Sequence, residues 1–184
     1  MRRISFLVPA VLALVLGGCA GQGITVNEHS PTYLWEDVRY AQDGRDTRVV
    51  IRGNPFGLQQ PIFEKAVLDA MRGQQMWLKT NFTASPANAH KDFKVVMLFN
   101  GPDDVLGEDL CSVPGKYSSV SGSTGFRVQA AWCYGDDPET QVVGSAGANS
   151  VNSPAFAALI GQTTRALFPF TPDDDDGQDN DLVD

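Results

Sequence analysis

The sequence has no long hydrophobic run and few of the residues from which catalytic and metal sites are most often built. Its 184 residues include only two histidines and three cysteines. The longest apolar stretch, residues 4–16, is 13 residues long and is interrupted by Ser5 and Pro9. A membrane-spanning helix needs roughly 20 apolar residues, so this stretch is too short to cross a bilayer.

Positive charge is also scarce, and this excludes two classes of partner. The chain has 14 Lys and Arg against 22 Asp and Glu, for a net charge of −8. No basic stripe with interleaved aromatic residues is present, so nucleic-acid binding is not expected. No polybasic run is present to attract lipid headgroups.

Known catalytic motifs are missing as well. The sequence contains no G-x-S-x-G motif, no Walker motif and no dinucleotide-binding glycine loop. His90 is the one histidine expected within the folded part, since His29 falls in a small, polar N-terminal segment. An enzyme would have to use His90 and nearby acids as its base, and we expect neither a cofactor nor a metal centre.

What is present begins at the N-terminus. Arg2 and Arg3 precede the apolar stretch, which ends in Leu16-Gly17-Gly18-Cys19. This arrangement resembles the lipobox of bacterial lipoproteins. The resemblance implies that residues 1–18 are a signal peptide that is removed, and that Cys19 carries three acyl chains. Two chains already give stable membrane anchoring. The alternative is an ordinary secretory signal cleaved near the same place, with Cys19 either free or structural.

The residue after Cys19 bears on the destination. An Asp at this position would favour retention in the inner membrane, whereas this chain has Ala20. The resemblance therefore implies a protein anchored in the outer membrane that faces the periplasm.

The other two cysteines, Cys111 and Cys133, form a natural pair. In an oxidising compartment, two cysteines of a folded domain most often form a disulfide. A redox-active pair or a metal site would need closer spacing, such as C-x-x-C, and further ligands. The bond would close a loop of about 20 residues, which stabilises by roughly 3 kcal/mol in the chain-entropy model.

Composition divides the mature chain into three parts. Residues 19–30 are small and polar and are expected to form a flexible tether. Residues 31–170 have the size and apolar content of a single domain. Residues 171–184 hold seven acidic residues and little to bury, so a disordered acidic tail is expected.

Hydrophobic periodicity predicts the elements of the domain. Strands are expected at 48–52, 93–99, 126–133 and 139–149, and the last two form a hairpin. Helices are expected at 61–78 and from Ser153-Pro154 to Pro169. Residues 33–40 are interpreted either as a first strand or as a segment packed across the sheet.

This order predicts an α+β fold, a two-layer sandwich with a mostly antiparallel sheet of about four strands and two helices on one face. The layout is loosely similar to small envelope lipoproteins of two kinds, those of lipopolysaccharide assembly and those that are accessories of transport. The similarity covers only the order of the elements.

Acidic residues concentrate in two segments that the disulfide would draw to one end of the sheet. Carboxylates in such number can hold a calcium ion, although ordinary solvated turns have the same composition. The candidate ion-binding residues are Asp103, Asp104, Glu108, Asp109, Asp136, Asp137 and Glu139.

A second candidate is the segment Arg52-Gly53-Asn54-Pro55-Phe56-Gly57, between the first predicted strand and helix. It is interpreted as a turn in which Phe56 packs on the helix. As a binding site it would present Arg52, Asn54 and Phe56 to a protein partner.

The sequence thus favours a non-enzymatic, lipid-anchored envelope protein that contacts another envelope protein. The alternatives are a domain that binds a small ligand or a divalent ion, and an enzyme built around His90.

Overall fold

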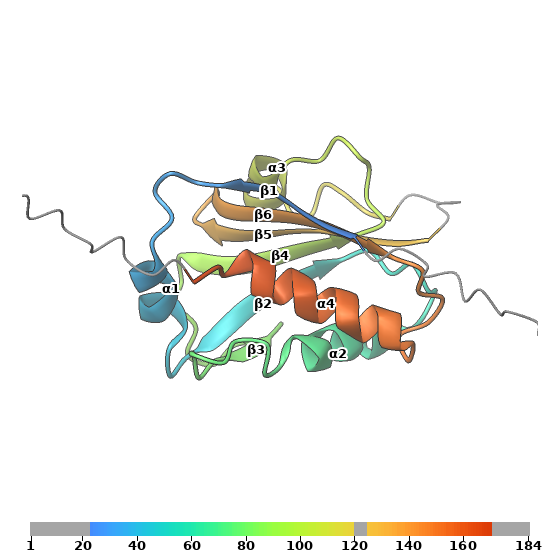
Figure 1. Cartoon of the computed structure of the whole chain (residues 1–184), viewed down its shortest axis with the longest axis horizontal. Helices are drawn as coiled ribbons and strands as arrows, with labels where there is room; N and C mark the ends of the chain where they lie inside the picture. Colours follow the sequence, from blue (N-terminus) through green and yellow to red (C-terminus); the bar gives the residue numbers. More distant parts are fainter. Residues whose placement is uncertain (1–22, 120–124, 171–184) are drawn as a thin grey trace, which may run out of the picture.

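The computed structural model of the chain describes residues 23–119 and 125–170. The predicted signal peptide, Cys19 and the acidic tail therefore lie outside the described residues. Along the chain lie β1 (Gly23–His29), α1 (Trp35–Gln42), β2 (Asp46–Arg52), α2 (Gln60–Met71), β3 (Asn81–Thr83), β4 (Phe93–Phe99), α3 (Gly107–Ser112), β5 (Phe126–Tyr134), β6 (Asp137–Ala146) and α4 (Pro154–Leu167) (Figure 1).

The strands form one mixed sheet in the order β1-β6-β5-β4-β2-β3. β1, β6, β5 and β4 are paired antiparallel, whereas β2 runs parallel to both β4 and β3. Helices α2 and α4 cover one face of the sheet (Figure 1). The predicted α+β sandwich is confirmed, with six described strands in place of about four and four described helices in place of two.

β4 is apolar along almost its whole length because both of its faces are covered. Val95, Met97 and Phe99 belong to the main core under the helices. Val96 and Leu98 point to the opposite face and belong to a second, smaller core with α3. A strand buried on both faces has no reason to alternate apolar and polar residues.

This second core corrects the expectation for β5. The sequence predicted a solvent-exposed face through Arg127, Gln129, Ala131 and Cys133. Gln129, Ala131 and Cys133 are buried instead, because α3 and the segment around it pack over this face.

Two helix ends follow the expected local chemistry. Ser153 caps α4, since its Oγ accepts a hydrogen bond from the backbone N–H of Phe156 at 3.2 Å. The helix predicted over 61–78 ends early, at Met71. Gly73 follows with φ of +71°, a backbone conformation that favours glycine.

The N-terminal segment differs most from expectation. Residues 23–29, expected within the flexible tether, form β1 and pair with β6 from Gly23↔Ser145 to His29↔Thr140. Backbone pairing with the otherwise open edge of β6 outweighs the polar composition of the segment. Residues 35–42, within and beyond the segment interpreted as a strand or a packed segment, form helix α1.

The register gives the sheet two distinct ends. At the hairpin end lie Tyr134 and Asp137, which join β5 to β6, together with Phe93 at the start of β4. At the opposite end, which we call the Gly23 end, lie the start of β1 and the ends of β4 and β6. Helix α1 lies at the hairpin end, and α2 and α4 begin at the Gly23 end and run towards it (Figure 1).

None of the helices in the described ranges has both the length and the apolar character of a membrane span.

Candidate functional site

The predicted disulfide joins Cys111 of α3 to Cys133 near the hairpin end of β5, with 5.6 Å between the two Cα atoms. Both cysteines are fully buried in the second core. The bond fastens α3 to the sheet. It therefore fixes the position of one of the two acidic segments that were predicted to bind an ion.

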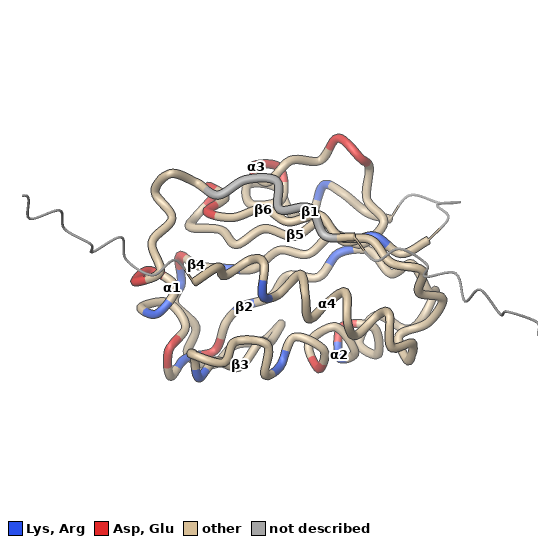
Figure 2. Tube along the Cα trace, viewed as in Figure 1, with Lys and Arg blue, Asp and Glu red and all other residues tan. Residues whose placement is uncertain are grey.

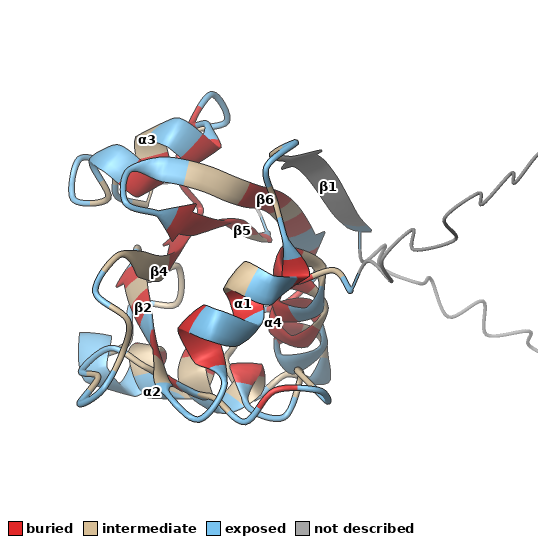
Figure 3. Ribbon diagram, turned by 90° about the vertical axis from the view of Figure 1, so that its left-hand side faces the viewer, coloured by how far each residue is buried: buried red, intermediate tan, exposed pale blue. Residues whose placement is uncertain are grey.

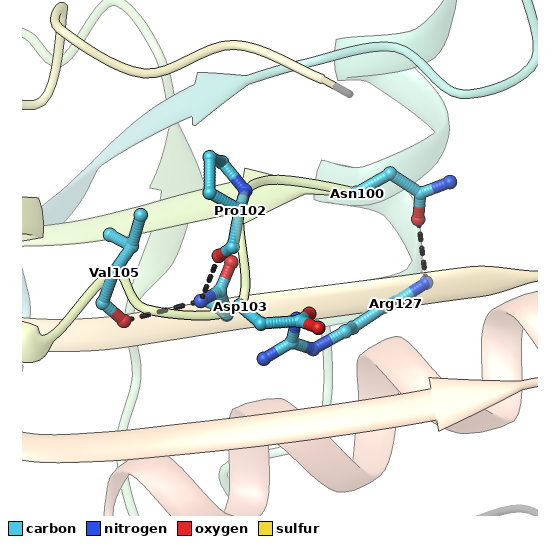
Figure 4. Close-up of polar contacts among 6 residues, drawn as sticks. Asn100, Pro102, Asp103, Val105 and Arg127 are labelled. Carbon is cyan, nitrogen blue, oxygen red and sulfur yellow. Dashed lines mark hydrogen bonds and ion pairs between the residues drawn. The ribbon is translucent and has the colours of Figure 1, made fainter. Parts of the chain in front are cut away.

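The acidic candidates, however, are not gathered at one end. Asp103 lies at the Gly23 end, where it pairs with the guanidinium of Arg127 near the start of β5 (Figure 4). The segment around it is held by Gln129, whose Nε2 donates to the carbonyl oxygens of Pro102 at 3.0 Å and Val105 at 3.2 Å. Asp104 is exposed in the same loop. Figure 2 shows acidic residues in the loop between β4 and α3, away from the β5–β6 hairpin.

Two further candidates have structural partners of their own. Asp109 accepts a hydrogen bond from the hydroxyl of Tyr117 at 2.9 Å. Asp136 lies 3.7 Å from the ammonium group of Lys94. In the described ranges, no group of three or more His, Cys, Asp or Glu side chains is arranged to hold a metal ion. The expectation that the disulfide brings all seven carboxylates together is therefore wrong. β4 ends at the Gly23 end of the sheet, so the loop between β4 and α3 begins there and holds Asp103 beside Arg127 at that end.

The predicted partner-binding loop is part of the core. Phe56 is only partly exposed, and its ring lies 5.3 Å from that of Phe126 and 5.9 Å from that of Phe156. Asn54 folds the turn through hydrogen bonds with the backbone of Leu58. Arg52 is exposed, and its Nε donates to the carbonyl of Pro114 at 3.2 Å. The structural interpretation of this loop holds, and it presents no free aromatic surface.

His90 belongs to a row of aromatic rings at the hairpin end. The ring centroids are separated by 5.0 Å from Tyr40 to His90, 5.2 Å from His90 to Phe93 and 5.0 Å from Phe93 to Tyr134. Phe93 in turn stacks on the buried Trp132, at 5.1 Å. The core thus supports the row from below, while Tyr40 and Tyr134 are 61% and 50% exposed.

Two adjoining cavities open beside these rings. One, of 560 Å³, lies against Tyr40, His90, Phe93, Asp37 and Asp92, and the other, of 760 Å³, lies against Glu108, Asp137, Gln141 and the segment 30–32. Tyr134 and Glu139 line both cavities. We call the pair the hairpin groove. Figure 3 views the molecule from this end.

The hairpin groove is acidic. Five carboxylates line it, from Asp37, Asp92, Glu108, Asp137 and Glu139, against the one ammonium group of Lys91. Three of the five were candidate ion-binding residues. The five come from α1, the segment before β4, α3 and β6, so the fold and not the local sequence brings them together.

Glu139 lies partly buried where the two cavities meet. Burial raises the pKa of its carboxyl above the usual range, the nearby Asp37 carboxylate raises it further, and a hydrogen bond with Thr32 opposes the shift. Its Oε2 is buried without a hydrogen-bond partner. An ionised carboxylate in this position favours a cation beside it.

This shift predicts how a Glu139→Gln variant behaves with pH. Because the pKa is raised in the folded state, the stability cost of Glu139 builds up as the pH rises above the unfolded pKa and is complete above the folded pKa. The cost disappears below the unfolded value of about 4.3. We expect Glu139→Gln to melt at a higher temperature than wild type at pH 7 and at nearly the same temperature at pH 4. A thermal scan checks this, with Asp104→Asn as a control that shows no such difference.

Two sequence signals pointed to residues of this site: the histidine before a buried strand, His90, and the acidic candidates Glu108, Asp137 and Glu139. The aromatic row was not predicted, because the segment that contains Tyr40 was interpreted as a strand or a segment packed across the sheet, and Tyr134 follows the predicted end of its strand. Phe93 was assigned to the buried strand on its apolar character alone.

No family model matches the chain, and no curated protein sequence matches it. Among solved structures, the chain is similar to the PelC dodecamer from Paraburkholderia phytofirmans, with 10% sequence identity and a TM-score of 0.43. The match covers 80% of this chain and 97% of that one. At this level the similarity carries no argument about function.

Proposed function

We propose that this protein is a lipid-anchored, non-enzymatic module of the bacterial cell envelope, held in the outer membrane and facing the periplasm, which acts by contacting another envelope protein. The observation that carries the proposal is the gathering of exposed apolar side chains at the hairpin end, opposite the end at which the described chain begins.

The anchor is supported by the N-terminal sequence and by the register of β1. Cys19 precedes Gly23 by four residues, which span about 14 Å at most. A lipid on Cys19 would therefore hold the Gly23 end close to the bilayer. The nine residues of β5 extend about 30 Å, so the hairpin end is free to reach away from the membrane.

The contact surface is supported by where the large apolar side chains are exposed. Nine such side chains are exposed among the residues that the structure covers. Ile62, Leu106 and Val113 are scattered over α2 and the two ends of α3. The other six lie around α1 and the β5–β6 hairpin: Leu34 precedes α1, Tyr40 belongs to it, Tyr134 ends β5, and Met76, Trp77 and Phe170 line one cavity with Trp35 of α1. A concentration of exposed apolar residues is typical of a protein interaction site.

The non-enzymatic part rests on the packing of His90. Its ring lies between Tyr40 and Phe93, and its Nδ1 lies 3.9 Å from the carboxylate of Asp92. These ring contacts are typical of a histidine that contributes to packing and not to catalysis. A His90→Ala variant that keeps full biological function would support the proposal, and a loss of function with unchanged partner binding would favour an enzyme.

The anchoring is tested by labelling cells with an alkyne-tagged palmitate. We expect the wild type to incorporate the label and to sediment with outer membranes, and Cys19→Ala to incorporate none. As a control, a cleavable secretory signal without a lipobox in place of residues 1–19 releases the domain into the soluble periplasm. An unlabelled, soluble wild type would contradict the anchor.

Binding of a small ligand remains the second candidate, because the cavities of the hairpin groove have the size of small-molecule sites. A ligand that binds only the folded state must raise the melting temperature. A screen of the full mature chain that finds a small ligand, without any protein partner in cells, would favour this candidate.

A further inference from the structure

We propose that the hairpin groove binds an extended, cationic segment of the partner protein, with an Arg or Lys side chain placed between the exposed aromatic rings and the carboxylate of Glu139. This inference rests on the proposed function, since it names the chemistry of the partner and the surface that receives it.

Charge complementarity is the first step. The groove presents five carboxylates and one ammonium group, whereas residues 19–172 as a whole hold 15 acidic and 12 basic residues. The negative charge of the groove is therefore a local property of this end. A cationic segment would be drawn to it, and an acidic one repelled.

The aromatic row supplies the second step. Tyr40 remains exposed beside one cavity of the groove and Tyr134 where the two cavities meet, although their neighbours His90 and Phe93 are half-buried. A guanidinium or ammonium group is attracted to the face of such a ring. Phe93 stacks on Trp132 and contacts the rings of Tyr134 and His90, and His90 contacts Tyr40. The rings are therefore supported before a partner arrives, which lowers the entropic cost of binding.

Glu139 gives a specific position for the charge. It lines both cavities, and its buried Oε2 lacks a hydrogen-bond partner. A guanidinium in either cavity would lie beside this carboxylate, and a nearby opposite charge stabilises its ionised form. The two cavities meet at this residue and Tyr134, so a chain that fills both must be extended and must pass across the ends of β5 and β6.

The test uses the full mature chain in non-ionic detergent and a fluorescent nine-residue peptide that alternates Arg and Ser. Its Glu-Ser counterpart, of equal length, is the matched probe. We expect the Arg peptide to bind and the Glu peptide not to bind, as measured by fluorescence anisotropy. Affinity should fall as salt is raised, since the contacts are partly exposed.

Variants then locate the binding. Tyr134→Ala and Asp92→Asn should each lower the affinity for the Arg peptide by about tenfold, because each variant removes one contact with the cation. The controls Ile62→Ala and Asp104→Asn remove an exposed apolar side chain and an exposed carboxylate outside the groove, and both should bind as wild type does.

Three results would overturn the inference. The first is that the Arg peptide fails to bind at millimolar concentration, and the second is that the Glu peptide binds with the same affinity as the Arg peptide. The third result is that groove variants and control variants lower the affinity for the Arg peptide by the same factor. Binding of arginine amide as tight as that of the peptide would show a site for a small cation instead. In each case, a protein partner crosslinked to this chain in cells would still support the proposed function, although the inference about the groove would be wrong.

Discussion

Replacing Trp132 with Ala is expected to lower the free energy of unfolding by about 3–5 kcal/mol. Trp132 is fully buried in β5. Its ring stacks on Phe93 at 5.1 Å and meets Tyr33 and Phe168 edge-on at 5.9 and 5.8 Å. The cavity left by Ala would lie directly beneath the aromatic row, so peptide binding in the hairpin groove should weaken together with stability. Urea unfolding followed by circular dichroism measures the change.

Trp132→Phe is the matched variant. It keeps an aromatic ring in the core, and it removes an indole Nε1 that is buried without a hydrogen-bond partner. Its loss of stability should therefore stay below about 2 kcal/mol. Equal losses for Ala and Phe would mean that the indole contributes through something other than the packing of its ring.

Removing the disulfide is expected to have the second large effect. The bond joins residues separated by 22 positions, and closing a loop of this length stabilises by about 3 kcal/mol in the chain-entropy model. The double variant Cys111→Ala with Cys133→Ala should lose about this much in urea unfolding.

Reduced wild type supplies the comparison. In the presence of a reducing agent its unfolding midpoint should fall to near that of the double variant. Because both cysteines are buried, reduction should be slow in the folded state and fast in urea. A double variant as stable as the oxidised wild type would show that α3 stays on the sheet without the bond.

Elements with a clear local sequence pattern were predicted correctly. β4 is apolar because both of its faces are buried, and the prediction of residues 93–99 matches its bounds. Ser153 and Pro154 mark the start of α4 as expected. The same holds for the disulfide, because two cysteines in one domain leave a single pairing.

Other elements depend on contacts that no local pattern encodes. β1 contains only a three-residue β-branched run, Ile24-Thr25-Val26, and it becomes a strand because β6 offers it a partner. The outer face of β5 was predicted to be exposed to solvent, because the sequence of residues 126–133 does not show that α3 packs over this face.

The site shows the same limit. The acidic segments were identified, but their positions were not, because Asp103 pairs with Arg127 at the Gly23 end while Glu108, Asp137 and Glu139 reach the hairpin groove. The aromatic row joins α1, the segment before β4 and the end of β5. Such a combination arises only from the order of strands in the sheet.

Site-specific photocrosslinking in living cells tests most directly whether the hairpin end is the contact surface of a membrane-held domain. A photoreactive residue would replace Tyr134 at the hairpin end or Ile62 on α2 as the control, with Cys19 intact. We expect one reproducible protein adduct in the membrane fraction from position 134 and none from position 62. Adducts from position 62 alone, or the same adducts from both positions, would contradict the account.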